Sequence, residues 1–532
     1  MPSPLLRFPG STSPAIRLGI CLAATLATLY LVASLAHSHY NRGEHGLPAG
    51  CDEFGYLNMA RAIDAGSTFG NHAERPFIDE LLIDLRNQFP TTNHFRWAVA
   101  PHAYHIDQSG QKIINQYPPG VGLMLAPLPI EARRVAFPVL CAVIGALALA
   151  LAGTLFWNGK LTVWPIVLIP ALALTLIQFD AIQLELMRVD SLAPTYGLLI
   201  ASGWLLPKRP GWSLFLLSLT VIFRLPNALL FAPAGLAALF LSEGRERRIQ
   251  KTIARALKLA LPIFLSGFGL YLLYAYLLLG NPFAITYSTL DQAFASEGGL
   301  ASNLRFYFVD KTSWLGPHLF AIALLLGACL IKPRQLKWFL FGLALIGFNY
   351  AFYLSHKVQI DYYPYASSLF CIGLALAFLP YEKAGPRLRI ALGAASLALL
   401  VYLASVAHPP ARNAPESFRA KQEQLQAEFG GYDVVWAEHR SGTVEYATNK
   451  AGFRYNWGTQ KARSYIMNWL RERGYRQAIW ASDQDMPPES EIAHLLEKAN
   501  IPFEIVESEA TGTRFVIPPA SLSDDSQTQD PR

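Results

Sequence analysis

The segment RVAFPVLCAVIGALALALAGTLF (residues 134–156) carries one charge, at Arg134, and is almost entirely apolar from there to Phe156. An α-helix rises about 1.5 Å per residue, so about 20 apolar residues cross the roughly 30 Å of hydrocarbon in a bilayer. The segment is long enough for this. It therefore predicts a transmembrane helix.

Further apolar runs of this kind divide the first 407 residues. We expect membrane helices at 15–37, 134–156, 161–178, 190–206, 211–223, 226–241, 257–279, 316–331, 337–354, 363–380 and 388–407. Arg7 and Arg17 precede the first run and no clear cleavage site follows it, so we interpret it as a retained signal anchor. The predicted fold class is an all-α polytopic membrane protein with about 11 transmembrane helices, followed by a small C-terminal α/β soluble domain.

Composition supports this division into a membrane part and an aqueous part. The 532 residues are 52% hydrophobic and 15% charged, whereas soluble domains average about 25% charged. This excludes an ordinary soluble enzyme. From His408 onward there are 14 basic and 18 acidic residues, so the net positive charge belongs to the membrane part. Basic loops suit an anionic membrane surface, and we expect no nucleic-acid partner.

Basic residues cluster in every second connection between the predicted helices. The clusters are Lys160, Lys208 with Arg209, 245–258, 332–337 and 383–389. Such connections face the cytoplasm. The segments 38–133, 179–189, 281–315 and 355–362 then face outward, the N-terminus is cytoplasmic, and an odd number of crossings places the C-terminal part outside.

The C-terminal part has the alternating pattern of a small α/β domain over 408–521. The expected elements are helices at 416–428, 460–473 and 489–499 and strands at 433–436, 477–481, 503–506 and 514–517. Residues 522–532 are polar, and we expect them to be disordered. Residues 1–407, with the long outward loop 38–133, form the other predicted domain.

The motif CDEFGYLNMA (residues 51–60) follows the first predicted helix and contains two adjacent carboxylates, Asp52 and Glu53. It predicts an amphipathic helix along the bilayer surface, with Phe54, Leu57 and Met59 on its apolar face. The acidic pair has two interpretations. It is typical of a helix start, because carboxylates favour the first turn, and it also fits general-base chemistry.

A second motif, QYPPGVGLMLAP (residues 116–127), ends the same outward loop. Its apolar run is too short to span a membrane, and the double proline predicts the start of a helix at the membrane interface. The third motif is FRLPN (residues 223–227), where Arg224 separates two short apolar runs. An arginine at that depth needs an anion or a water-filled cavity nearby, or it snorkels to the headgroups.

Other candidates lie at the outer ends of predicted helices. They are Arg188, Asp190, His356, Lys357, Asp361, Tyr362 and Tyr363. In the first outward loop, His102 and His105 have a spacing that would allow a weak metal site. The sequence predicts no particular cofactor. A divalent metal ion at the site is an alternative that it also allows.

Taken together, these motifs resemble the GT-C class of membrane glycosyltransferases, which includes protein O-mannosyltransferases and bacterial aminoarabinose transferases. The resemblance rests on Asp52-Glu53 after the first helix, Tyr117-Pro118-Pro119-Gly120, Asp190, Arg224 before Pro226, and Asp361-Tyr362. It covers most of residues 1–407. This chain departs from the pattern at Leu225, which separates Arg224 from Pro226, and at Asp361, where many relatives have Arg.

The resemblance implies transfer of a sugar from a polyprenyl-phosphate donor to a lipid, glycan or protein acceptor, at the outer face of a bacterial inner membrane. It implies Asp52 as the base, with Glu53 orienting it or a metal, and inversion at the anomeric carbon. The donor phosphate would be bound by Arg224 with Arg188 or Lys357. The other implied substrate contacts are Tyr56, Tyr117, Asp190, His356, Asp361 and Tyr362.

Two other functions fit a polytopic membrane protein. A lipid or glycan flippase would also place charges within the membrane, but its halves should be related by internal symmetry, which the sequence lacks. A sensor whose C-terminal domain binds a partner would have no need of a carboxylate pair and an arginine at one interface.

Overall fold

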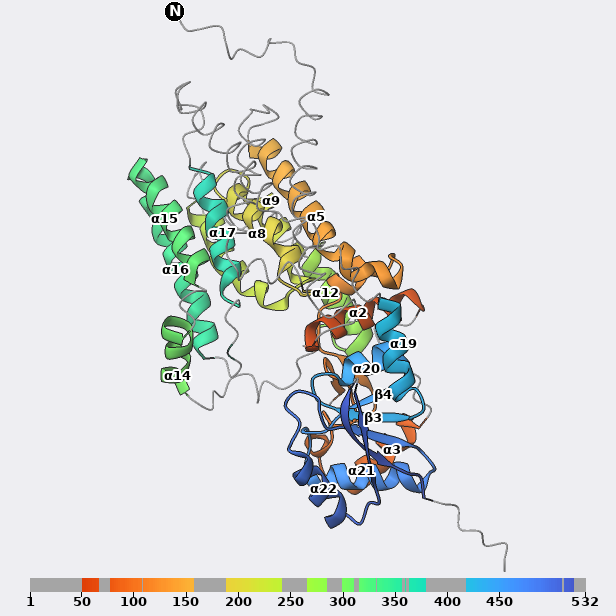
Figure 1. The fold of residues 1–532 in the computed structure, drawn as a ribbon. Helices are drawn as coiled ribbons and strands as arrows, with labels where there is room; N and C mark the ends of the chain where they lie inside the picture. Colours follow the sequence, from red (N-terminus) through yellow and green to blue (C-terminus); the bar gives the residue numbers. More distant parts are fainter. Residues whose placement is uncertain are drawn as a thin grey trace, which may run out of the picture.

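A computed structural model describes residues 50–66, 77–107, 109–156, 188–241, 266–284, 299–310, 315–331, 333–355, 359, 363–378, 418–509 and 511–520. The predicted helices at 15–37, 161–178 and 388–407 and the predicted disordered end 522–532 lie outside the described residues. The described chain forms a helical bundle and a mixed α/β part, with α2 (Gly50–Asp64) near their junction (Figure 1).

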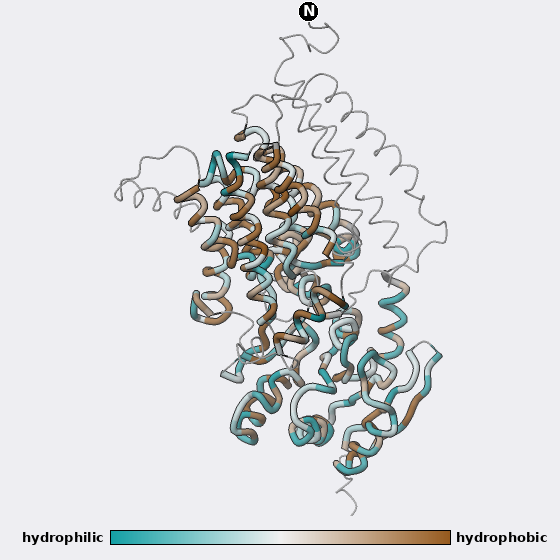
Figure 2. The backbone as a smooth tube through the Cα atoms, turned by 90° about the vertical axis from the view of Figure 1, so that its left-hand side faces the viewer, coloured by the Kyte–Doolittle hydropathy of each residue, from teal (hydrophilic) through white to brown (hydrophobic). Residues whose placement is uncertain are grey.

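The bundle consists of apolar helices at the positions that the sequence predicts. They are α5 (Arg133–Phe156), α8 (Tyr196–Leu205), α9 (Pro210–Val221), α10 (Phe231–Phe240), α12 (Gly267–Leu279), α15 (Gly316–Ile331), α16 (Leu336–Leu354) and α17 (Tyr365–Leu376). By length and composition, Ala136–Phe156 and Pro333–Leu354 could cross a membrane, and five further apolar helices have 10–17 residues. Hydrophobic residues predominate in this part and are less frequent in the α/β part (Figure 2).

Two predicted helices begin later than the apolar runs indicate. In the predicted helix 190–206, an Oδ1 atom of Asp190 accepts hydrogen bonds from the backbone N–H groups of Leu192 and Ala193. This Asx turn leads into a 3₁₀ turn, η4 (Ala193–Thr195), before α8 begins. In the predicted helix 226–241, the 3₁₀ helix η5 (Leu225–Leu230) precedes α10. The break that the sequence predicts at Arg224 is confirmed.

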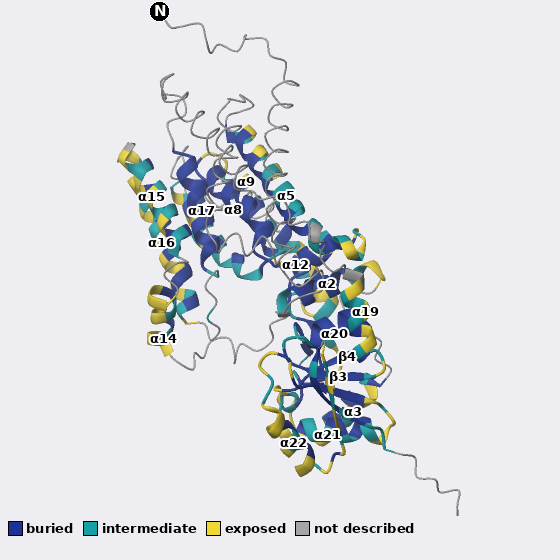
Figure 3. Ribbon diagram, viewed as in Figure 1, coloured by how far each residue is buried: buried dark blue, intermediate teal, exposed yellow. Residues whose placement is uncertain are grey.

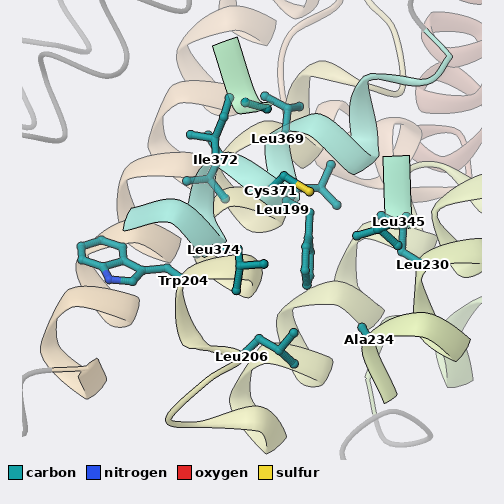
Figure 4. Close-up of a cluster of buried hydrophobic side chains, with 14 of the residues drawn as sticks. Leu199, Trp204, Leu206, Leu230, Ala234, Leu345, Leu369, Cys371, Ile372 and Leu374 are labelled. Carbon is teal, nitrogen blue, oxygen red and sulfur yellow. The ribbon is translucent and has the colours of Figure 1, made fainter. Parts of the chain in front are cut away.

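The centre of the bundle is the crossing of α8 and α17, both of which are buried along their lengths (Figure 3). Apolar side chains such as Leu199, Trp204 and Leu369 fill the space around this crossing (Figure 4). At the crossing itself the backbones touch. A Cβ atom on Gly203 would lie 1.9 Å from the carbonyl oxygen of Phe370. Small residues permit this close approach, which maximises van der Waals contact between membrane helices.

We expect Gly203→Ala to lower the thermal unfolding temperature of the protein in detergent. The added methyl group would force α8 and α17 apart, and such overpacking costs about 1–3 kcal/mol. The control is Gly327→Ala in α15, where a Cβ atom would meet nothing within 4 Å and a helical alanine is favourable. Equal unfolding temperatures for the two variants would show that the crossing is looser than described.

In its described residues, the predicted first outward loop (38–133) contributes two further α-helices and a short hairpin beyond α2. They are α3 (Ile78–Gln88), β1 (Tyr104–Ile106), β2 (Ile113–Asn115) and α4 (Gly120–Leu125). The C-terminal part contains α19 (Phe418–Phe429), β3 (Val434–Ala437), α20 (Ser441–Thr448), β4 (Ala451–Arg454), α21 (Gln460–Glu472), β5 (Gln477–Trp480), α22 (Glu489–Lys498), β6 (Glu504–Ser508) and β7 (Gly512–Ile517).

The strands of the C-terminal part form one mixed sheet in the order β4-β3-β5-β7-β6. β3 pairs in parallel with β4 and β5, whereas β7 is antiparallel to β5 and β6. The predicted α/β character of this part is thus confirmed. The helix α20 and the strand β4 were not predicted from the sequence.

Both faces of the sheet are covered, partly by the first outward loop. Alternate residues of β3 face opposite sides. Val434 and Trp436 share a core with α3, α21 and α22, whereas Val435 and Ala437 share one with α2, α19 and α20. Segments from opposite ends of the chain therefore complete the same two cores.

This packing corrects the expectation for α2. Phe54, Leu57 and Met59 were expected to face the bilayer surface, but these side chains are buried in the protein. α2 packs against α4 on one side and α20 on another. Its apolar residues are therefore covered by protein and not by lipid.

Candidate functional site

The site is built where the two motifs of the first outward loop meet. The side chain of Asn115 donates a 2.9 Å hydrogen bond to the carbonyl oxygen of Gly55 and accepts one of 2.8 Å from the backbone N–H of Tyr117. Gly55 allows this contact, because a Cβ atom there would lie 2.5 Å from the Tyr117 ring. The start of α2 and the Tyr-Pro-Pro-Gly segment are thereby held side by side.

The Asp52 carboxylate, in the first turn of α2, is oriented by this segment. The Tyr117 hydroxyl donates a 2.5 Å hydrogen bond to Asp52 Oδ1, and Gln116 Nε2 donates to the same hydroxyl at 2.7 Å. The Cys51 sulfur lies 2.9 Å from the Tyr117 hydroxyl. Burial, with the Asp52 charge as the next cause, raises the pKa of the Cys51 thiol to about 12. Cys51 therefore stays protonated at neutral pH and is not a thiolate nucleophile.

Arg224 is buried at the break between α9 and η5. Its Nη1 donates a 3.0 Å hydrogen bond to Ser191 Oγ, and its guanidinium carbon lies 4.4 Å from the centre of the Tyr363 ring. Tyr353 also hydrogen-bonds to Arg224. Three separate segments therefore hold one buried cation in place.

Tyr56 connects the acid and the cation. Its hydroxyl hydrogen-bonds to Ser191 and lies close enough to Asp52, Asp190 and Arg224 for their charges to act on it. Burial raises the pKa of Tyr56 well above its usual value, followed in effect by the Asp52 charge, so this hydroxyl stays neutral. Tyr363 likewise feels the charges of both Asp52 and Arg224. The Asp52 carboxylate and the Arg224 guanidinium, both predicted from the sequence, thus lie near the same two tyrosines.

Two predicted acidic residues make contacts that hold the backbone of the site. Glu53 is buried, and its Oε1 accepts hydrogen bonds of 3.1 Å from Arg134 Nε and from the backbone N–H of Val189. It thereby ties α2 to α5 and to the segment that precedes Asp190. The hydrogen bonds that Asp190 accepts just before η4 hold the adjacent Ser191 toward Arg224.

Comparison with solved structures covers nearly the whole chain. The structure of ArnT from Cupriavidus metallidurans bound to undecaprenyl phosphate matches with a TM-score of 0.50 and 10% sequence identity, over 96% of this chain and 98% of that chain. The chain has the GT-C fold. The apo oligosaccharyltransferase of Archaeoglobus fulgidus is also similar, with a TM-score of 0.43 and 12% identity over 92% of this chain and 69% of that chain. No family model and no curated sequence matches.

The match to the GT-C fold extends beyond the part on which the sequence resemblance rests. That resemblance covered residues 1–407, whereas 96% of the chain is matched in space. The C-terminal mixed sheet is therefore included in the alignment. Its packing against α2 brings it close to the candidate site of this GT-C fold.

The remaining predicted site residues are placed only in part. Arg188 is exposed, and His356, Lys357, Asp361 and Tyr362 lie outside the described residues. His105 packs on Trp97 at 4.6 Å between ring centres, and His102 packs on His439 at 5.4 Å. Within the described ranges, no three His, Cys, Asp or Glu side chains gather as metal ligands.

Some residues of the site were missed by the sequence analysis. Gln116 and Ser191 lie inside motifs that were recognised, but a single sequence does not show that their side chains turn toward Tyr117 and Arg224. Tyr353 precedes a predicted outward connection and gave no signal beyond its aromatic character. Tyr363 was predicted as a candidate at a helix end. Its contact with Arg224 could not be predicted, because it depends on how the helices of the bundle pack.

Proposed function

We propose that the chain is a membrane glycosyltransferase that transfers a sugar from a polyprenyl-phosphate donor to an acceptor hydroxyl. The observation that carries this proposal is the arrangement of Asp52 and Arg224 around Tyr56 and Tyr363. A carboxylate can accept the proton of an attacking hydroxyl, and a guanidinium can bind the departing phosphate. Transfer from a phosphate-linked sugar needs both groups at one place.

The proposed reaction is a single displacement. The acceptor oxygen attacks the anomeric carbon, and a new carbon–oxygen bond forms as the bond from that carbon to the phosphate oxygen breaks. The acceptor proton passes to Asp52, and the electron pair of the broken bond stays on polyprenyl phosphate, which leaves. Because one base and no carboxylate nucleophile take part, the anomeric configuration is inverted.

The other residues support these two roles. Tyr117 and Gln116 hold the Asp52 carboxylate in one orientation, so that its lone pair is available for the proton. Ser191, Tyr353 and Tyr363 hold Arg224 where a phosphate at the outer end of α9 could reach it. The structurally similar ArnT was solved with undecaprenyl phosphate, and this agrees with a polyprenyl-phosphate donor here.

The proposal is tested by mass spectrometry of envelope lipids and glycans from cells with the gene, without it, and with Asp52→Asn. We expect one envelope species to lose the mass of a hexose or pentose in both mutant strains. The lost mass identifies the sugar, and the species identifies the acceptor. Identical glycans and lipids in all three strains would contradict the proposed function.

We also propose eleven membrane crossings, with the N-terminus in the cytoplasm and the C-terminal part outside. This rests on the alternation of basic connections and on an odd number of apolar runs. A reporter that fluoresces only in the cytoplasm, fused after Arg532, is expected to stay dark, whereas the same reporter fused before Arg7 is expected to fluoresce. A bright C-terminal fusion would mean an even number of crossings.

A further inference from the structure

The C-terminal part contains one exposed indole. Of its four tryptophans, Trp436, Trp469 and Trp480 are at most 4% exposed, whereas Trp457, directly after β4, is 36% exposed. An indole left in water loses the free energy that its burial would contribute, about 25 cal/mol per Å² of apolar surface. Its surroundings show what it is suited to bind.

Trp457 is held rigidly by charged neighbours. Its Nε1 donates a 2.6 Å hydrogen bond to Glu438 Oε1, and the Arg454 guanidinium carbon lies 4.8 Å from its ring centre. Arg454 also lies 4.9 Å from the ring centre of Trp97, which belongs to the first outward loop. The two indole rings are 5.6 Å apart. A buried arginine thus joins two aromatic rings from opposite ends of the chain.

Two histidines, His102 and His439, lie next to each other near Arg454, whose charge acts on His102. The His102 ring packs on the partly exposed His439, whose Nε2 lies 2.5 Å from Asp485 Oδ2. Burial is the largest of the causes that lower the pKa of His102 to about 3, so His102 is neutral at neutral pH. Its Nδ1 atom is buried and has no hydrogen-bond partner in the part of the chain that the structure describes. We call Trp97, His102, Glu438, His439, Arg454 and Trp457 the Trp457 patch.

The Trp457 patch adjoins Asp52. Arg454 lies near the neutral side chains of Cys51 and Tyr117, and the Tyr117 hydroxyl donates to Asp52. Arg454 Nη2 also donates a 3.0 Å hydrogen bond to the carbonyl oxygen of Tyr104, next to the segment that packs on α2. In this network of contacts Asp52 has Arg224 on one side, through Tyr56, and the Trp457 patch on the other, through Tyr117.

We infer that the Trp457 patch binds a carbohydrate portion of the acceptor. This inference rests on the proposed function, in which Arg224 binds the donor phosphate and Asp52 must contact the acceptor hydroxyl. A rigid indole offers an apolar face to the C–H groups of a pyranose ring. Carboxylate, imidazole and guanidinium groups around it suit the sugar hydroxyls. The acceptor is therefore a glycolipid headgroup or a glycan chain, and not a simple peptide hydroxyl.

Binding is tested by saturation-transfer NMR on the purified full-length protein. The probes are the methyl glycosides of glucose, galactose, mannose and N-acetylglucosamine. We expect transfer to the ring protons of at least one glycoside. Trp457→Ala should weaken that binding roughly three- to tenfold, the size expected for one lost aromatic contact. Trp457→Phe, which keeps a ring but cannot donate to Glu438, should bind more tightly than the alanine variant.

The matched control is Ile505→Ala on β6, another exposed apolar side chain of the same sheet. It should bind like wild type, and because the experiment contains no sugar donor, glycoside binding is measured without sugar transfer. This separates failure of the inference from failure of the proposed function. The inference is overturned if no glycoside receives saturation, or if both Trp457 variants, folded as judged by thermal unfolding, bind like the Ile505 control.

Cells that carry Trp457→Ala show whether the bound carbohydrate belongs to a glycolipid headgroup or to a glycan chain. Mass spectrometry of the separated glycolipid and polysaccharide fractions should show reduced addition of the transferred sugar in one of them. Reduction in the lipid fraction assigns a glycolipid headgroup, and reduction in the other assigns a glycan chain. Reduced addition to protein alone would overturn the inference.

Discussion

Replacing Asp52 by Asn is expected to lower the rate of sugar transfer by roughly two to four orders of magnitude, the range that a general base contributes. Asn keeps the size of the side chain and its ability to begin a helix. It also still accepts a hydrogen bond from Tyr117 through its amide oxygen. It cannot accept the acceptor proton. The purified variant should insert and unfold like wild type and be inactive with a lipid-linked donor.

A control for Asp52→Asn is the same substitution at the other end of α2. Asp64 forms a 2.9 Å ion pair with Arg133, and its own side chain is 64% exposed. Arg133 is buried and also donates hydrogen bonds to two backbone carbonyl oxygens. Because Asn can still accept the hydrogen bond from Arg133, Asp64→Asn should keep activity within about threefold of wild type. If the Asp52 variant is as active as the Asp64 variant, Asp52 begins the helix and does not act as the base.

Replacing Arg224 by Met is expected to reduce donor use by about two to three orders of magnitude, the loss seen when a group that stabilises transition-state charge is removed. Arg224→Lys should retain part of the activity, because an ammonium keeps the charge but loses the two parallel N–H donors that fit phosphate oxygens. The loss should appear in the apparent affinity for the donor, in the maximal rate, or in both. Affinity for the acceptor should change little.

The stability and membrane insertion of the Met variant distinguish phosphate binding by Arg224 from a structural role. Removing a buried charge relieves its desolvation, so the Met variant should insert no worse than wild type. Arg209→Met, at the opposite end of α9, changes the same residue type outside the site and should leave donor kinetics unchanged. Wild-type donor kinetics in the Arg224→Met variant would move the phosphate site to Arg188 or Lys357 and leave Arg224 with a structural role.

Much of the fold and part of the site followed from local sequence patterns. Apolar runs give α15 and α16 almost to the residue, because burial and helix length depend on nearby residues, whereas α8 and α10 begin later than predicted. Asp52 and Arg224 were predicted as site residues because a charged side chain beside an apolar run is costly unless it has a partner or a function. Their meeting around Tyr56 could not be predicted, since it depends on how α9 packs against the first outward loop.

The errors have a common physical cause. An amphipathic pattern in α2 shows that Phe54 and Met59 must be covered, but it does not show whether lipid or α20 covers them. β4 was missed because Phe453 is the one residue among Ala451–Arg454 that favours a strand. β4 is specified by its pairing with β3 and by the hydrogen bond from the Arg454 backbone to Ala98. Such contacts between distant segments leave no local signal.

The first outward loop and the C-terminal sheet share two hydrophobic cores. These cores can be completed only after the C-terminal strands have been synthesised. The backbone N–H of Arg454 bonds to Ala98, yet Arg454 is made long after Ala98. At about 5 to 20 residues per second, roughly 20 to 70 s of translation separate the two. During that time apolar residues such as Leu81 and Phe95, buried in the finished protein, lack their partners in the C-terminal sheet. The side of the candidate site that the C-terminal sheet covers can therefore form only when the ribosome has nearly finished the chain.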